Sequence, residues 1–156
     1  MTGASFNRKG SRQDYETPPD FIQAVERRFG IINCDFAASK LNSKGQVWID
    51  EAMDSLSADC PWNKYKGICW LNPPFSNIAP WAEKCWQESE KGAKILFLVP
   101  ASVGSNWFAK FVFGKANVLF LNGRLQFVGA SDPYPKDCIL ACYGYGIESF
   151  EIWKWK

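Results

Sequence analysis

CWLNPPFSN, residues 69–77, joins an apolar run that is typical of a buried strand to Asn72, two prolines and Phe75. In an open α/β sheet, ligands bind beyond the carboxyl ends of the strands, which is where this stretch would lie. Proline fixes φ and has no N–H, so the Asn72 carboxamide and the Pro73 carbonyl are acceptors with little conformational freedom to lose. Asn-Pro is also a common turn signal, so the stretch predicts either a simple turn or a binding site.

Rigid acceptors beside an aromatic ring suit a planar amino group, such as the exocyclic nitrogen of adenine. The lone pair of that nitrogen is delocalised into the ring. If the two acceptors took hydrogen bonds from both of its N–H groups out of the ring plane, the lone pair would become localised and able to attack. Phe75 would stack on the base and hold it there. This chemistry requires no general base, which agrees with a chain that contains no histidine. The absence of histidine also excludes Ser-His-Asp and Cys-His nucleophilic schemes.

Hydrophobic periodicity on either side of this stretch predicts helices alternating with strands early in the chain and mainly strands late. The segment 16–30 has the signals of a helix, with Thr17 as the N-cap and Gly30 as the stop. Two further helices are expected at 78–91 and 106–113. Strands are expected at 31–35, 46–49, 67–71, 93–100, 117–121, 125–129, 138–146 and 150–155. This pattern indicates an α/β fold with a mostly parallel sheet and antiparallel strands near the C-terminus.

The composition is that of a folded globular protein. The chain has 156 residues, 47% of them apolar, and its formal net charge of +2 neither demands nor excludes nucleic acid. The six cysteines form no CxxC pair, so we expect no zinc site of that kind, and reduced thiols in a cytoplasmic protein. No apolar run approaches membrane-spanning length, and the first residues lack the apolar core of a signal peptide.

The stretch NPPF after an apolar strand resembles motif IV of amino-methyltransferases, which use S-adenosylmethionine. Further segments occur in a characteristic order: DYETPPDF, CDFAAS, WLNPPF, LFLVPAS, NWF and NGRLQF. This order is similar to that of phage-type DNA N6-adenine methyltransferases, the small Dam-like family, from about Tyr15 to about Tyr143. Motif IV alone is shared with protein-glutamine and RNA methyltransferases. The combination with GRLQF and the early ETP is therefore the more specific part of the resemblance.

The resemblance implies a Rossmann-like class I methyltransferase fold. It assigns the target base and the catalysis to Asn72, Pro73, Pro74 and Phe75. It assigns S-adenosylmethionine to residues of the early ETP segment, the CDFAAS loop and the acidic loop that follows: Thr17, Pro18, Asp35, Ala37, Ala38, Ser39, Asp50 and Asp54. The CDFAAS loop lacks the family's glycine-rich form. Asp35 can also be a turn acid, Thr17 a simple helix cap, and Asp50, with Glu51 beside it, a solvated charge.

Basic residues are the candidates for contact with DNA. Arg124 in NGRLQF follows a turn, and its guanidinium suits a phosphate. Lys64 and Lys66 would add sequence-independent affinity. Residues 1–14 are expected to form a flexible basic arm with the same effect, and its charged residues are Arg8, Lys9 and Arg12. Each of these side chains can equally be a solvated surface charge.

We therefore expect S-adenosylmethionine-dependent methylation of adenine N6 in DNA, with the adenine leaving the duplex stack to reach the NPPF stretch. Residues 15–156 would form one methyltransferase domain without a separate target-recognition domain, so the loops 50–66 and 128–137 would choose the base. RNA adenine or a glutamine amide as the acceptor, and a non-catalytic DNA-binding module, remain open alternatives. The expected partner is DNA, and no association with a membrane is expected. The sequence does not determine the oligomeric state. A phage or prophage enzyme would act in the bacterial cytoplasm.

Overall fold

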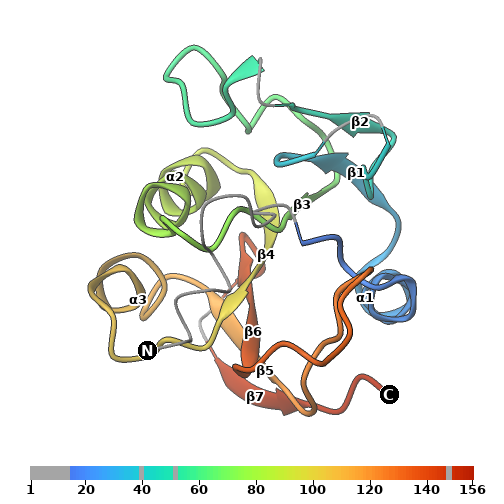
Figure 1. The fold of residues 1–156 in the computed structure, drawn as a ribbon. Coiled ribbons are helices and arrows are strands. Elements are labelled where there is room, and N and C mark those ends of the chain that lie inside the picture. Colours follow the sequence, from blue (N-terminus) through green and yellow to red (C-terminus); the bar gives the residue numbers. More distant parts are fainter. Residues whose placement is uncertain (1–14, 39–40, 51–52, 147–148) are drawn as a thin grey trace.

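The described strands form one seven-stranded sheet with helices on both faces (Figure 1). A computed structural model describes residues 15–38, 41–50, 53–146 and 149–156. The strands are β1 (Ile32–Asp35), β2 (Val47–Trp48), β3 (Ile68–Leu71), β4 (Lys94–Pro100), β5 (Asn117–Leu121), β6 (Cys138–Tyr143) and β7 (Phe150–Trp153). The helices are α1 (Pro19–Phe29), α2 (Ala79–Ser89) and α3 (Asn106–Phe111). The predicted α/β class is confirmed, and each of these elements lies within a predicted range.

The strand order in the sheet is β2-β1-β3-β4-β6-β5-β7. The pairs β2–β1, β1–β3, β3–β4 and β5–β7 are parallel, whereas β6 runs antiparallel to both β4 and β5. The predicted mostly parallel sheet with an antiparallel part near the C-terminus is therefore confirmed. Because β6 reverses direction, the segment 122–137 leaves and re-enters the sheet at the edge where β3 and β4 end.

The helices flank the sheet, with α1 on one side and α2 and α3 together on the other (Figure 1). α1 begins with Pro19, whose missing N–H is not needed in the first turn of a helix. It ends at Gly30, which has φ 109° and donates its N–H to the Glu26 carbonyl. The predicted stop at Gly30 is thus confirmed, since this φ favours a residue without a Cβ.

The predicted strand at 125–129 is wrong. Its alternation of buried Leu125 and Phe127 with exposed neighbours is strand-like, but its backbone forms no ladder with any described segment. Val128 instead donates its N–H to the Glu16 carbonyl at 3.0 Å, and Leu125 accepts from the Tyr134 N–H at 2.7 Å. The segment is held by single bonds to two different parts of the chain, and both lie near the edge described below.

The core is built on the central strands. β6 is buried along its whole length, and β4 is buried after its first residue, as expected for apolar strands covered on both faces. All six cysteines are unpaired, and five of them are buried. Over the described residues, no helix combines the length and the hydropathy needed to cross a bilayer.

Candidate active site at the carboxyl ends of β1 and β3

Asn72 follows β3, and its side-chain amide is held by the segment that precedes α1. Its Nδ2 donates to the backbone carbonyl of Tyr15 at 2.6 Å and to Oγ1 of Thr17 at 3.0 Å. A backbone carbonyl can only accept, so the amide nitrogen must face Tyr15 and the carboxamide has one orientation. The structure records no partner for Oδ1 among the described residues, and this oxygen remains an acceptor for a ligand.

Thr17 was predicted as the N-cap of the first helix, and this prediction is wrong. The N-cap position is Pro18, and no side-chain cap bond is present there. The Thr17 side chain is only 1% exposed, and its hydroxyl accepts from Asn72. The Thr17 hydroxyl therefore binds the distant residue Asn72 and does not cap the helix, and Thr17 orients the Asn72 side chain.

Asp35 is the last residue of β1 and is buried, with 3% of its surface exposed. Its Oδ1 accepts from the N–H of Ala37 at 3.2 Å, and its Oδ2 accepts from the N–H of Lys44 at 2.9 Å. Burial raises the pKa of Asp35 to about 6, although these two hydrogen bonds and the charge of Lys44 oppose the rise. The carboxyl group is thus both a turn acid and a group that changes charge near neutral pH.

Asp35 and Asn72 face one hollow at the sheet edge. Its lining residues come from the segment before α1, from the ends of β1 and β3 and from the connection after β1: Tyr15, Glu16, Thr17, Asp35, Ala37, Asn42, Lys44, Trp70 and Asn72. Lys44 Nζ donates to Oε2 of Glu16 at 2.9 Å, so an ion pair forms part of the lining of the hollow. The structure therefore brings together the predicted residues Thr17, Asp35, Ala37 and Asn72.

Sequence analysis missed five residues that line this hollow: Tyr15, Glu16, Trp70, Asn42 and Lys44. The last two lie in the polar connection that follows the CDFAAS turn, and nothing in its composition marks it as more than a loop. The one sequence feature that could have pointed to Lys44 is its short separation from Asp35. Lys44 lies only nine positions after Asp35, so the chain can turn and place Lys44 beside the Asp35 carboxylate.

Phe75 lies in a cluster of four rings with Tyr15, Phe127 and Tyr134. All six pairs of ring centroids are 5.5 to 6.5 Å apart, and Phe75 is 8% exposed. Pro73 is buried and Pro74 is half-buried beside it. The ring that was predicted to hold a base thus packs against three other rings in this structure.

The remaining predicted cofactor residues lie elsewhere. Asp50 accepts from the N–H of Met53 through both its backbone and its side chain, and Asp54 is exposed with φ 46°. Neither lines the hollow. Ala38 donates its N–H to the Ile49 carbonyl at 3.2 Å and so joins the turn to the chain after β2. Ser39, Glu51 and the basic residues of the 1–14 arm lie outside the described residues.

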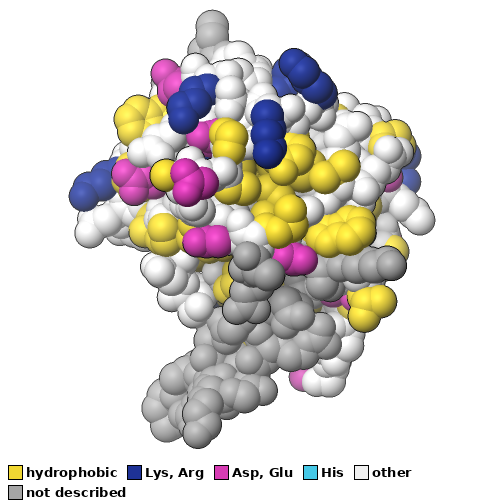
Figure 2. Space-filling view, turned by 90° about the horizontal axis from the view of Figure 1, so that it is seen from above, with side chains coloured by type: hydrophobic (Ala, Val, Ile, Leu, Met, Phe, Trp, Pro, Cys, Tyr) yellow, Lys and Arg dark blue, Asp and Glu magenta, His cyan; other side chains and the backbone are white. Residues whose placement is uncertain are grey.

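The basic candidates for DNA contact are exposed. Arg124 Nε lies 3.4 Å from Oδ1 of Asp137, and both side chains are mostly exposed. Lys64 lies over the ring of Tyr65, with Nζ 5.2 Å from its centroid, and Lys66 is exposed. On the described part of the face in Figure 2, basic side chains stand apart, with apolar and acidic side chains between them. The charge there is mixed, so any contact with DNA phosphates would be made by separate residues.

Comparisons with known proteins agree on one family. Residues 4–142 match the family described as DNA N-6-adenine-methyltransferase (Dam). A protein of Escherichia phage T1 named DNA N-6-adenine-methyltransferase is 28% identical over 114 residues, which cover 73% of this chain and 47% of that protein. A protein of the same name from Haemophilus phage HP1 is 26% identical over 132 residues, which cover 82% of this chain and 73% of that protein. The chain thus spans about half the length of the T1 relative.

Proposed function

The chain belongs to the DNA N-6-adenine-methyltransferase (Dam) family, and we propose on this basis that it transfers a methyl group from S-adenosylmethionine to N6 of adenine in DNA. The observation that carries the proposal is the Asn72 amide, whose nitrogen is bound by Tyr15 and Thr17 and whose oxygen is left for a substrate. The relatives' names support the acceptor, since both are called DNA N-6-adenine-methyltransferases.

The residues of the hollow fit the methyl donor. When bound, S-adenosylmethionine supplies an activated methyl group on a positively charged sulfur, and its methionine part carries an ammonium group. The buried Asp35 carboxylate offers an acceptor of opposite charge for that ammonium. Ala37 lines the hollow beside it, and its small side chain permits close approach of a ligand to the backbone. Thr17 supplies a further polar group in the same hollow.

Asn72 acts on the acceptor amine. Its Oδ1 accepts a hydrogen bond from one N–H of the adenine N6 amino group, and the Pro73 carbonyl accepts a hydrogen bond from the other. As N6 forms its bond to the methyl carbon, positive charge builds on the amine, and both oxygens stabilise it. S-adenosylmethionine would supply the methyl group and its sulfur would keep the electron pair of the broken bond, while the excess proton of N6 would pass to solvent. Preorganisation by Tyr15 and Thr17 means that Asn72 need not reorient during the reaction.

The adenine reaches Phe75 only when one ring of the aromatic cluster moves. Tyr134 is the proposed movable ring, because the residues around it from 131 to 137 are exposed and lie outside helices and strands. Its displacement would open a ring face of Phe75 for the flipped base. The same segment would then lie against the DNA, as expected for a recognition loop.

The affinity for S-adenosylmethionine is expected to fall as the pH is lowered through about 6, by about tenfold per pH unit below that value. Above its pKa the Asp35 carboxyl is charged and attracts the ammonium, whereas below it the group is neutral and the attraction is lost. Calorimetry at several pH values on either side of 6 measures this dependence. Asp35→Asn is the control and should bind weakly at every pH; a parental affinity that does not change with pH contradicts the role of Asp35.

Arg124→Ala is expected to weaken DNA binding and to reduce the slope of log K against log salt by about one, because one phosphate contact is lost. The Arg124 guanidinium is paired only at the surface, with Asp137, so a phosphate can replace that partner. Fluorescence anisotropy over a series of salt concentrations measures the slope. Arg27→Ala, in the last turn of α1, is the matched control for loss of an exposed arginine. A loss confined to one DNA sequence, with the salt slope unchanged, would make Arg124 a base reader.

The function is tested by offering labelled S-adenosylmethionine together with an adenine-containing duplex, an RNA and a glutamine-containing peptide. Label on the N6 amino group of DNA adenine is the expected result. If the label appears only on the RNA or only on the peptide, that molecule and not DNA is the substrate. If the methyl donor fails to raise the melting temperature, the chain is a DNA-binding module without the cofactor, because any ligand of the native state stabilises it.

A further inference from the structure

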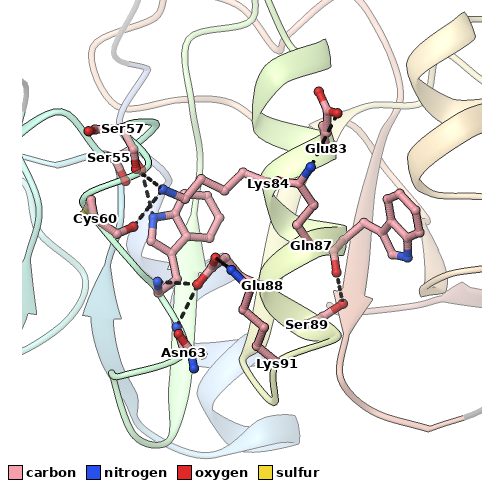
Figure 3. Close-up of polar contacts among 12 residues, drawn as sticks. Ser55, Ser57, Cys60, Asn63, Glu83, Lys84, Gln87, Glu88, Ser89 and Lys91 are labelled. Carbon is pink, nitrogen blue, oxygen red and sulfur yellow. Dashed lines mark hydrogen bonds and ion pairs between the residues drawn. The ribbon is translucent and has the colours of Figure 1, made fainter.

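Two charged residues of α2 are buried although neither lines the hollow described above. Lys84 is 8% exposed and Glu88, one turn later, is 4% exposed. Figure 3 shows both side chains directed at the loop between β2 and β3. Burying a charged group costs free energy unless hydrogen bonds replace its water. The bonds that Lys84 and Glu88 make therefore indicate what they do.

Lys84 binds the carbonyl groups of the loop. Its Nζ donates to the carbonyl of Ser57 at 2.6 Å and to that of Cys60 at 2.7 Å (Figure 3). The same Nζ lies 5.2 Å from the ring centroid of Trp62, within the range of a cation–π contact. One side chain of α2 thus holds the loop at three residues.

Glu88 binds the N–H groups of the same loop. Its Oε1 accepts from the N–H of Trp62 at 2.6 Å and of Asn63 at 3.0 Å, and its Oε2 pairs with Lys91 at 3.0 Å. Burial raises the pKa of Glu88, but these hydrogen bonds outweigh it and hold the pKa below its usual range. Carboxylate and ammonium together satisfy both kinds of backbone group in a loop that has no strand partner there.

Trp62 connects the loop between β2 and β3 to the turn after β1 through its packing contacts. Its ring is fully buried, its Nε1 donates to the Ser55 carbonyl at 2.9 Å, and it stacks on Phe36 with centroids 4.4 Å apart. Phe36 stands between Asp35 and Ala37, and its N–H donates to the Trp70 carbonyl at 2.9 Å. A displacement of Trp62 would therefore move the turn that presents the Asp35 carboxylate to the hollow.

We propose that Lys84 and Glu88 are positioning residues for the turn 35–37, and that they set the affinity for S-adenosylmethionine by holding Trp62 against Phe36. The inference rests on the proposed function, since it takes this turn as part of the cofactor site. Neither residue touches the hollow. Their effect is carried by two packed rings and by the backbone bonds of one loop.

Glu88→Ala and Lys84→Met are expected to weaken S-adenosylmethionine binding about tenfold, as is usual for residues that act through contacts with a site. Hydrogen exchange at the amides of residues 35–38 should quicken in both variants without any ligand, because Phe36 is no longer held. Glu88→Gln should restore most of the binding, since a carboxamide oxygen still accepts from Trp62 and Asn63. Glu83→Gln is the matched control, because Glu83 is exposed on the same helix and its carboxylate accepts a hydrogen bond from the side chain of Gln87.

The inference is overturned if the variants bind S-adenosylmethionine as tightly as the parent, or if exchange quickens at 53–63 and not at 35–38. A parent that does not bind S-adenosylmethionine contradicts the proposed function instead, and the exchange result still decides whether the anchors reach the turn. If Glu88→Ala does not fold, Lys84→Met and Glu88→Gln decide the question at a temperature where circular dichroism shows both to be folded.

Discussion

Replacing Asn72 with alanine is expected to lower the single-turnover rate of methyl transfer about 10²–10³-fold, while S-adenosylmethionine affinity stays close to the parental value. The Oδ1 oxygen accepts from the adenine amine most strongly as charge develops on it, so its loss falls on the rate more than on binding. The measurement is methyl transfer to an adenine-containing duplex with enzyme in excess, alongside calorimetry with the methyl donor. Transfer at the parental rate would reduce the NPPF stretch to a turn.

Two further variants separate the oxygen from its orientation. Asn72→Asp would place an oxygen 2.6 Å from the Tyr15 carbonyl, and two acceptors repel each other. We therefore expect Asn72→Asp to be severely impaired as well. Thr17→Val removes one acceptor for the Asn72 amide and should give an intermediate rate, whereas Thr17→Ser keeps the hydroxyl and should be near parental. Equal rates for Thr17→Val and Thr17→Ser would mean that Tyr15 alone orients Asn72.

Replacing Asp35 with alanine is expected to weaken S-adenosylmethionine binding about 10²-fold at neutral pH, because a buried charged partner of the ligand's ammonium is lost. The N–H groups of Ala37 and Lys44 also lose their acceptor, which should lower the free energy of unfolding by about 1–3 kcal/mol. Because burial raises the pKa of Asp35, the charged carboxylate itself opposes folding at neutral pH, so the net loss of stability should be largest below about pH 4. Calorimetry gives the affinity, and urea unfolding gives the stability of the same sample.

Asp59→Ala is the control for this variant, since Asp59 is an exposed acid on the loop between β2 and β3. It should change neither affinity nor stability. If Asp35→Ala loses stability but binds the methyl donor as the parent does, then Asp35 serves only the turn. The cofactor site would in that case lie elsewhere on the chain.

The fold was predictable because its signals are local. The apolar run 93–100 became β4, and the apolar stripe of the segment 16–30 became α1, since burial on both faces of a strand or on one face of a helix leaves a clear period in the sequence. The same rule failed at 125–129. There, alternation reflects two buried side chains under a loop, and among the described residues no strand pairs with it.

The site was predictable only where its residues directly follow strands. Asp35 and Asn72 end neighbouring parallel strands, so topology alone brings them to one edge. Thr17 became a candidate through the family resemblance, whereas the local pattern predicted a helix cap. Its hydroxyl bonds to a residue 55 positions away, which a local pattern cannot register. The ion pair between Glu16 and Lys44 likewise joins segments that are distant in sequence, and it follows from the folded chain rather than from any short pattern.

Because β6 runs antiparallel to β5, the loop between these two strands is a part of the chain where another sequence can be inserted. Phe120 near the end of β5 pairs with Ile139 near the start of β6, so the residues between the two strands form the loop of a hairpin and need no crossover. The entropy of closing such a loop rises only slowly with its length. Longer or unrelated segments can therefore replace the exposed residues 131–133 of this loop, while the strand register and the buried Phe127 and Tyr134 are kept. Under the proposed function, we expect grafting at this point to alter the preference for DNA sequence while Asn72 and the ring cluster around Phe75 stay in place.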